Sequence, residues 1–370
     1  MTDSRIARVR AYAVPAAVAD PAGTPVEGGG LELLRLTLAD GSEGVASARG
    51  DCADAPLGEV VDAAAAMAVG LLGMDAAQRV ALHDDLNPDG EATTQIASLC
   101  DIALWDAWGH HLGVPVWQML GGFRERLPAY ASLSEPGSLE EALDSVRRVA
   151  AMGYRGVKLQ MGSDPAFDLE LVATLDAAFG DGELQFMVDL EQRYSFEDAL
   201  CLGRRLSELG FAWMEAPLPD SDLAAYLELN RAVTVDILPA GDTLVGSAAW
   251  LEGLQGGAWS RLRADACSGG GITGLLRAMA LADALDVGVE LQSVGHPPAQ
   301  AANLHLMLGV PGCTWFEHHD PLRPLDYGVA SPLKIDPEGR VAAPEGPGLG
   351  LLMDFARIEA DAVETFDSAA

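Results

Sequence analysis

Seven polar residues recur along the chain at intervals of 21 to 31 residues, and most of them follow a short apolar run. The apolar run at residues 212–214 ends in Glu215, for example, and the run at residues 186–188 ends in Asp189. Each interval is about the length of one strand and one helix, so we expect these side chains to follow one another around the active end of a barrel. In chain order they are Lys158, Asp189, Glu215, Asp242, Asp265, His296 and Glu317.

Three consecutive members of this series are acids, namely Asp189, Glu215 and Asp242. Carboxylates that converge on one point repel one another unless a cation lies between them. Because an all-oxygen ligand set favours Mg²⁺ over softer metals, we predict a Mg²⁺ site. The competing interpretation is three unrelated acids at strand ends.

Asp265 and His296 come next and have the residue types for acid–base chemistry. A carboxylate that holds one ring nitrogen of a histidine fixes the tautomer and raises the basicity of the other nitrogen. We therefore predict that His296 accepts a proton from a substrate. The other histidines have no such position and are interpreted as surface or helix residues: His83, His110, His111, His305, His318 and His319.

The elements that must position these residues follow a regular pattern after residue 127. Eight strands are predicted at residues 128–133, 156–159, 185–189, 211–215, 237–240, 261–264, 287–291 and 314–317. Helix-length segments such as 139–152, 196–209 and 273–285 lie between them. This alternation predicts a (β/α)8-type barrel rather than an open sheet.

The first part of the chain has a different pattern. Strands are predicted at residues 6–14, 31–38 and 44–48, with a hairpin turn at Asp40 and Gly41, and helices at 60–72, 75–86 and 91–112. These elements predict a separate α+β unit.

The chain is strongly acidic, with 23 basic and 55 acidic residues and a formal charge of −32, and its only lysines are Lys158 and Lys334. Such a surface repels phosphate backbones and anionic lipids, which argues against nucleic-acid and membrane partners. The longest apolar run, residues 63–74, is shorter than the roughly 20 residues that span a bilayer. The first residues carry no signal-peptide pattern, so we expect a cytoplasmic protein.

Two common cofactor patterns are missing from the sequence. None of the five cysteines forms a C-x-x-C pair, which fits a reducing compartment and argues against a zinc site of that kind. The glycine cluster at residues 269–271 lacks the lysine of a phosphate-binding loop, and no dinucleotide-binding G-x-G-x-x-G pattern opens a helix.

Several ordered motifs resemble one family over nearly the whole chain: GVKLQ at 156–160, MVD at 187–189, WMEAP at 213–217, Gly241-Asp242, Asp265 before GGGITG at 269–274, Gly295-His296 and WFE at 315–317. They resemble the mandelate racemase subgroup of the enolase superfamily. The resemblance implies an α/β fold, a modified TIM barrel of (β/α)7β type with an N-terminal α+β capping domain. The implied domains are the cap at 1–120, the barrel at 121–340, and a segment at 341–370 that returns to the cap.

The resemblance also implies roles for the seven residues. The reaction would be Mg²⁺-assisted removal of the proton α to a carboxylate. Asp189, Glu215 and Asp242 would be the metal ligands, and His296 with Asp265 the base. Glu317 would donate to or stabilise the enediolate oxygen, and Lys158 would meet the substrate carboxylate.

Gln160 departs from the family pattern, since racemases of the family carry a second lysine there. An amide cannot accept a proton at neutral pH, which disfavours two-base racemisation. The preferred hypothesis is a sugar acid dehydratase, which eliminates water from an acid sugar with a single base. The alternatives are a cycloisomerase of a sugar-acid lactone or anhydro acid, a racemase or epimerase, and a non-catalytic carboxylate-binding paralogue.

Further residues are candidates for substrate contacts. Glu191 is either the acid for the leaving hydroxyl or a fourth acid near the metal, and Gln160 lies beside the predicted site. Arg49, in a predicted cap loop at 47–54, is either a contact for a distal substrate group or an ordinary surface arginine. Arg193 and Tyr194 are weaker candidates, a second cap loop is predicted at 16–30, and family analogy implies a homo-oligomer.

Overall fold

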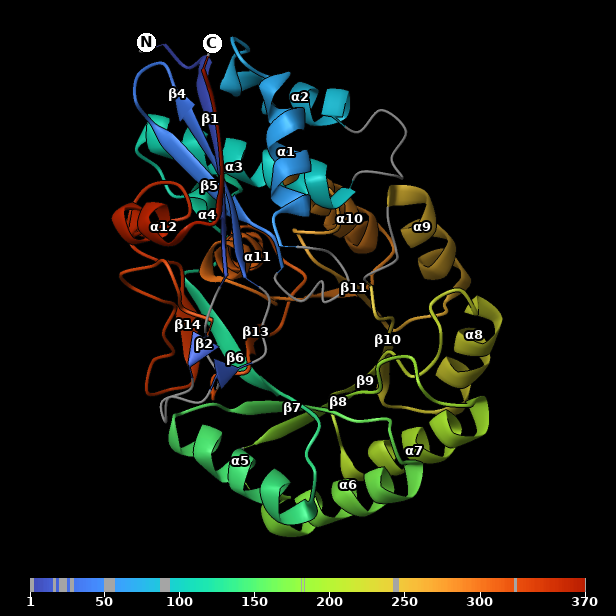
Figure 1. The fold of residues 1–370 in the computed structure, drawn as a ribbon. Coiled ribbons are helices and arrows are strands. Elements are labelled where there is room, and N and C mark those ends of the chain that lie inside the picture. The colour runs from blue at the N-terminus through green and yellow to red at the C-terminus, as the bar shows by residue number, and fades with distance from the viewer. Residues whose placement is uncertain are drawn as a thin grey trace.

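The computed structural model describes residues 3–15, 18–19, 25–26, 30–49, 57–86, 94–180, 182, 184–241, 246–322 and 325–369. Figure 1 shows two parts, an N-terminal unit at the top and a ring of strands and helices below it. The predicted metal ligand Asp242 and most of the two predicted cap loops lie outside the described residues.

The N-terminal unit is built on an antiparallel sheet in the order β15-β1-β4-β5. Its strands are β1 (Ile6–Val14), β4 (Leu31–Leu38), β5 (Glu43–Ser47) and β15 (Glu364–Ala369), and a short pair, β2 (Val18–Ala19) and β3 (Pro25–Val26), lies outside it. The turn at Asp40 and Gly41 joins β4 to β5, as predicted. β15 pairs with β1 along its length, so the last described strand completes a sheet begun by the first.

Helices cover one side of this sheet. α1 (Glu59–Val69) and α3 (Thr94–Leu112) pack against the strands, and the short 3-10 helix η1 (Ala76–Gln78), α2 (Arg79–Leu86) and α4 (Val116–Met119) pack against α3. α3 packs against β5 on one side and against barrel helix α10 (Gly271–Ala284) on the other, which explains its apolar residues on several faces. Gly44 permits the close approach of β5 to α3, because a Cβ there would lie 2.2 Å from the carbonyl oxygen of Ala103.

The predicted barrel is present, with eight strands in the expected order. They are β6 (Arg126–Leu133), β7 (Gly156–Gln160), β8 (Gln185–Asp189), β9 (Trp213–Glu215), β10 (Asp236–Leu238), β11 (Arg261–Ala264), β12 (Gly288–Leu291) and β13 (Phe316–His319). Parallel pairing runs through β10-β9-β8-β7-β6-β13, and β11 pairs with β12. β14 (Arg340–Ala342) adds an antiparallel partner to β6.

Helices connect successive barrel strands and surround them (Figure 1). They are α5 (Leu139–Ala151), α6 (Pro165–Phe179), α7 (Phe196–Leu209), α8 (Leu223–Ala232), α9 (Gly246–Gly256), α10 and α11 (Pro297–Gly309), and α12 (Phe355–Asp361) follows the barrel. Ser138 and Ser195 cap α5 and α7 by accepting hydrogen bonds from backbone N–H groups three residues on. Among the described residues, no helix has the length and apolar character to cross a membrane. The (β/α)7β order with an N-terminal cap confirms the predicted fold class.

The last barrel strand begins two residues later than predicted. The backbone N–H groups of Thr314 and Trp315 donate to the buried carboxylate of Glu290, at 3.1 and 3.2 Å, instead of joining the strand ladder. At its other end β13 includes His318 and His319, which pair with β6, so the interpretation of these two as surface or helix residues is wrong.

Polar contacts fix the cap to the barrel at the start of α10. The Asp101 carboxylate on α3 accepts hydrogen bonds from the backbone N–H and the hydroxyl of Thr273, at 2.9 and 2.6 Å. Ser98 accepts from the N–H groups of Gly270 and Gly271. A Cβ on Gly271 would lie 2.4 Å from the Asp101 carboxylate, so the glycine cluster allows two domains to approach closely.

We expect Asp101→Ala to weaken the attachment of the cap to the barrel. The substitution leaves a buried N–H and a buried hydroxyl of Thr273 without their acceptor, at a cost of roughly 2 to 4 kcal/mol in unfolding free energy. Urea denaturation followed by circular dichroism measures it. Asp85→Ala on exposed α2 surface is the control, and equal midpoints for the two variants would contradict this account of the junction.

Candidate active site

A cavity of about 310 Å³ opens at the carboxyl ends of the barrel strands. Arg49, which follows cap strand β5, lines it together with residues from the strand ends, so the cap and the barrel both contribute. Seven residues singled out from the sequence are among its lining residues: Arg49, Lys158, Gln160, Asp189, Glu191, Glu215 and Glu317.

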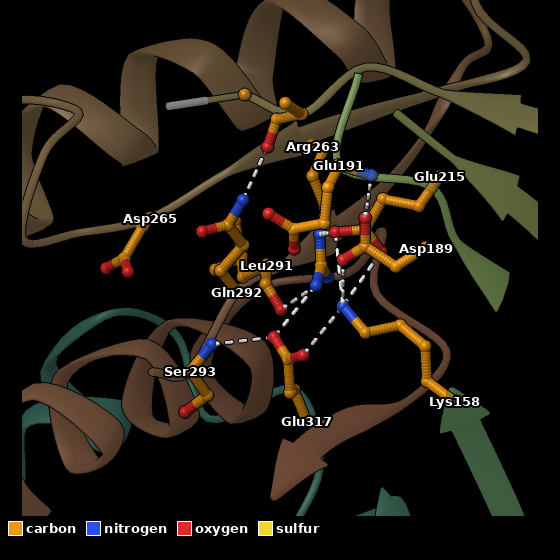
Figure 2. A network of polar contacts seen from close by, with 12 residues as sticks. Lys158, Asp189, Glu191, Glu215, Arg263, Asp265, Leu291, Gln292, Ser293 and Glu317 are labelled. Atoms are coloured by element: carbon orange, nitrogen blue, oxygen red, sulfur yellow. Dashed lines mark hydrogen bonds and ion pairs between the residues drawn. The ribbon is translucent and has the colours of Figure 1, made fainter. Parts of the chain in front are cut away.

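Lys158 lies at the centre of the charged network in the cavity floor. Its ammonium is 3.0 Å from Asp189 Oδ2, 3.1 Å from Glu215 Oε2 and 2.9 Å from Glu317 Oε1. Figure 2 shows the three carboxylates pointing at this one nitrogen. The series read from the sequence thus brings a lysine and three acids from four strands to one point.

Arg263, which sequence analysis missed, is the second cation of the network. Its Nε donates to Glu215 Oε1 at 2.9 Å, and its Nη2 donates to Glu317 Oε2 at 2.8 Å. Its remaining donors reach the Tyr130 hydroxyl and the Leu291 carbonyl oxygen, and its side chain is 0% exposed. The signal that could have identified Arg263 is its place in the sequence: it is a charged residue inside a predicted barrel strand, two residues before Asp265, rather than at the strand end.

Lys158, Glu215, Arg263 and Glu317 come from β7, β9, β11 and β13, which are alternate strands of the barrel. Alternate strands contribute the four side chains of one interior layer in such barrels, and these are usually apolar and branched. Here the layer is a closed ring of alternating charge, because each cation contacts both carboxylates.

The ring controls the charge of its members. Burial by itself would lower the pKa of Lys158, but the carboxylates of Glu215, Glu317 and Asp189 outweigh it and raise that pKa well above its usual value. Burial would raise the pKa of Glu317, but Arg263 and Lys158 hold it well below the usual range. Glu317 is therefore an ionised acceptor in this arrangement, which favours a stabilising role over a proton-donating one.

Asp265 and His296 occupy different surroundings. Asp265 Oδ1 accepts from the Cys267 N–H at 2.8 Å and from the Asn303 amide at 2.9 Å, and Arg49 Nε lies 3.7 Å from Oδ2. Figure 2 shows Asp265 set apart from the ring. Neither Asp265 nor His296 is among the described residues that line the cavity.

His296 lies beyond the end of its strand. β12 ends at Leu291, and the cavity is lined there by Gln292 and Val294, whereas His296 caps α11 and is fully buried. Its Nδ1 lies 3.1 Å from the carbonyl oxygen of Leu325.

Gln160 and Glu191 contact each other at the cavity wall. The Gln160 amide donates to Glu191 Oε1 at 3.0 Å, and the Glu191 N–H donates to Asp189 Oδ1 at 3.2 Å. The position of the family's second lysine is thus taken by an amide bound to an acid.

The backbone around the cavity is strained. Five described residues other than glycine have positive φ, and four of them line the cavity: Glu191 (52°), Gln192 (59°), Ala216 (46°) and Asp320 (20°). Such conformations cost of order 1 to 3 kcal/mol each and gather at functional sites. Their clustering marks the cavity as the functional centre.

Other rim residues have structural partners. Asp220 accepts from the N–H groups of Ala240 and Gly241, which fixes the backbone just before position 242. Tyr194 donates to Asp168 at 2.6 Å and Arg193 pairs with Glu135. Neither is among the described residues that line the cavity.

The described residues provide part of a binding site for a hard cation. No group of three or more His, Cys, Asp or Glu within them is arranged to hold a metal ion. Asp189 and Glu215 do present carboxylate oxygens to one shared positive group, and all-oxygen donors of this kind suit Mg²⁺. These two residues fit the predicted ligand set, whose third member, Asp242, falls outside the description.

Comparison with known proteins decides the family. The model of the enolase C-terminal domain-like family matches residues 141–357, which is more than half of the chain. The protein belongs to the enolase superfamily. Within it, the chain is 32% identical to muconate cycloisomerase 1 of Rhodococcus opacus over 72% of this chain and 70% of that protein. It is 28% identical to D-galactarolactone cycloisomerase of Agrobacterium fabrum, over 76% and 79% of the two chains.

Solved structures of the superfamily superpose along nearly the entire chain. One, from Pseudovibrio sp., is described as a mandelate racemase/muconate lactonizing enzyme, with a TM-score of 0.89, 27% identity and 99% of each chain covered. D-glucarate dehydratase from Agrobacterium tumefaciens, complexed with magnesium, gives a TM-score of 0.83 and 27% identity over 98% of this chain and 100% of that one. The mandelate racemase subgroup of the enolase superfamily, inferred from the motifs, is confirmed.

We expect Arg263→Gln to destabilise the protein strongly. It leaves two buried carboxylates with Lys158 as their shared cation, and removing one partner from a buried ion network costs about 3 to 5 kcal/mol. Arg263→Lys keeps a charge and should cost less. Denaturation midpoints measure both, with Arg205→Gln, which breaks an exposed pair with Glu208, as the control. A midpoint for Arg263→Gln equal to that of the control would show that the ring adds no stability.

Proposed function

We propose that the protein is a Mg²⁺-dependent lyase that removes the proton α to the carboxylate of an acid sugar and expels the β-hydroxyl as water. The observation that carries this proposal is the pair of side chains that β7 presents to the cavity. Lys158 is a buried cation among three carboxylates, while the next cavity-facing side chain on the strand, Gln160, is an amide. The strand thus offers charge stabilisation and no second base.

Asp189 and Glu215, with Asp242, would hold Mg²⁺. The ion would supply Lewis-acid stabilisation of negative charge on the substrate carboxylate. Lys158, whose pKa is raised far above neutrality, stays protonated and adds a fixed positive charge at the same oxygens. Arg263 donates to both Glu215 and Glu317, which holds the two carboxylates in place, and it helps to keep Glu317 ionised.

Substrate size and polarity follow from the cavity. A volume of about 310 Å³ suits a small organic acid, and the lining is rich in hydrogen-bonding side chains. Arg49, at the cap side of the cavity, would contact a hydroxyl or a distal carboxylate. Relatives named L-talarate/galactarate dehydratase and D-gluconate dehydratase, 29% and 26% identical, support an acid sugar as the substrate class.

Proton removal needs a base next to the α-carbon. The sequence-based prediction gives this role to His296 oriented by Asp265, with Glu191 as an alternative acid for the leaving hydroxyl. Neither His296 nor Asp265 is among the described residues that line the cavity, and their role as the base stays a prediction.

A second candidate, cycloisomerisation of a sugar-acid lactone or anhydro acid, needs the same proton removal. Two relatives favour it, D-galactarolactone cycloisomerase and 3,6-anhydro-alpha-L-galactonate cycloisomerase, each 28% identical to the chain. The two reactions differ in which β-oxygen leaves, and their products separate them.

The reaction is tested with Mg²⁺ and a panel of mono- and diacid sugars and their lactones. We expect a 2-keto-3-deoxy acid, detected with semicarbazide, and its loss when EDTA removes the metal. Rearrangement of a lactone seen by NMR, without a 2-keto product, would instead establish the cycloisomerase. No turnover of any panel member would overturn the enzyme assignment.

Metal binding has its own test. We expect Asp189→Asn to weaken Mg²⁺ binding at least about tenfold, equal to about 1.4 kcal/mol, because it removes a charged oxygen ligand. Isothermal titration calorimetry measures the affinity. Asp144→Asn, on an exposed helix surface, is the control, and equal affinities in the two variants would place the metal elsewhere.

A further inference from the structure

One buried carboxylate, that of Asp168, joins the loops that follow β7 and β8. Asp168 lies in the first turn of α6 and is 1% exposed. Its Oδ2 accepts a hydrogen bond from the Gly162 N–H, in the loop after β7, at 2.9 Å. The same oxygen accepts from the Tyr194 hydroxyl, in the loop after β8, at 2.6 Å. Hydrogen bonds to a carboxylate are short and strong, so this one side chain fixes the separation of the two loops.

The backbones of the two loops also meet directly at Gly162. Its φ is 114°, and a Cβ there would lie 2.7 Å from the carbonyl oxygen of Leu190. One residue earlier, the Met161 N–H donates to the Asp189 carbonyl oxygen at 2.8 Å. The two loops are therefore packed too closely to move independently.

The loop after β8 carries two neighbouring residues in strained conformations. Glu191 and Gln192 have φ values of 52° and 59°. Such left-handed conformations cost free energy in residues with side chains and persist only where the surrounding structure holds them. The Gln192 N–H donates to the Ala216 carbonyl oxygen at 2.7 Å. The bond from Tyr194 to Asp168 holds the loop two residues further on.

On the cavity side, the same two loops position Gln160 and Glu191. Both line the cavity, and the Gln160 amide donates to Glu191 Oε1 at 3.0 Å. Gln160 lies two residues before Gly162, and Glu191 lies three residues before Tyr194. Neither Asp168 nor Tyr194 is among the described residues that line the cavity. Asp168 thus supports this part of the cavity wall from behind.

We propose that Asp168 and Tyr194 are positioning residues that hold Glu191 and Gln160 in the geometry that binds a hydroxyl group of the substrate. This inference rests on the proposed function, because the acid sugar supplies the hydroxyl. A carboxylate is a strong acceptor for that donor, but hydrogen bonds weaken steeply when distance and angle depart from the best values. An acceptor that is fixed before the substrate arrives loses less freedom on binding.

Tyr194→Phe and Asp168→Asn test the inference. With the acid sugar that the wild-type enzyme turns over best, we expect kcat/KM to fall about tenfold in each variant, mainly through a higher KM, as when a supporting hydrogen bond is lost. Tyr194→Phe leaves the bond from Gly162 to Asp168 in place and is the milder change. Asp164→Ala is the matched control and should keep the wild-type kcat/KM. It removes the N-cap of the same helix without touching either partner of Asp168.

A double-mutant cycle separates positioning from a general loss of stability. If Tyr194 acts through Glu191, adding Tyr194→Phe to Glu191→Gln should lower kcat/KM by less than about twofold more. The fall in the denaturation midpoint caused by Tyr194→Phe should persist in the double variant.

Hydrogen exchange of residues 190–194, followed by mass spectrometry, needs no substrate. We expect it to be at least about fivefold faster in Tyr194→Phe than in Asp164→Ala, because the segment loses a contact that holds its strained backbone.

Three results would overturn the inference and leave the proposed function standing: a full tenfold further loss in the double variant, equal kcat/KM in Tyr194→Phe and Asp164→Ala, or equal exchange in these two. No turnover of any panel member by the wild-type protein would overturn both.

Discussion

Lys158 and Arg263 are buried inside the barrel and bind the same two carboxylates, those of Glu215 and Glu317. Taking any one of these ions out of water costs several kcal/mol, and only close, hydrogen-bonded partners offset that cost. Each member of the ring is therefore stable only while its neighbours are in place. Because the four come from alternate strands, correct closure of the whole barrel is the condition for the charged layer, and the charged layer in turn penalises barrels closed in another register.

The same constraint explains the character of the cavity above it. An interior layer that is rigid and charged gives a substrate carboxylate fixed partners that do not have to reorganise when negative charge develops. Strained backbone at Glu191, Gln192, Ala216 and Asp320 surrounds this layer, held by the rigid strands beneath. Ala216 has a φ of 46° and lines the wall without adding to the negative charge.

Much of the architecture could be predicted from the sequence, because strand-end acids at βα spacing leave a clear periodic signal. Lys158, Asp189, Glu215 and Glu317 meet as that spacing indicated. Arg263 was not predicted because the periodic signal marks residues at strand ends, whereas Arg263 lies inside a strand. Local spacing also cannot show that His296 falls five residues past Leu291.

The start of β13 could not be predicted for a related reason. Glu290, a carboxylate from another strand, takes the N–H groups of Thr314 and Trp315 away from the ladder, and β13 therefore starts at Phe316. Contacts between residues far apart in the sequence thus determine both the role of Arg263 and the start of β13. Periodicity of the surrounding residues carries no information about such contacts.

The pairing of β15 with β1 has a consequence for biosynthesis. Residues 8–13 find their outer sheet partner in residues 364–369, which leave the ribosome after every barrel strand. Throughout translation β1 exposes an unpaired edge, and such an edge can pair with other chains and promote aggregation. The sheet of the cap is therefore complete only after residues 364–369 have followed all eight barrel strands, so the cover over the cavity matures later than the barrel strands are made.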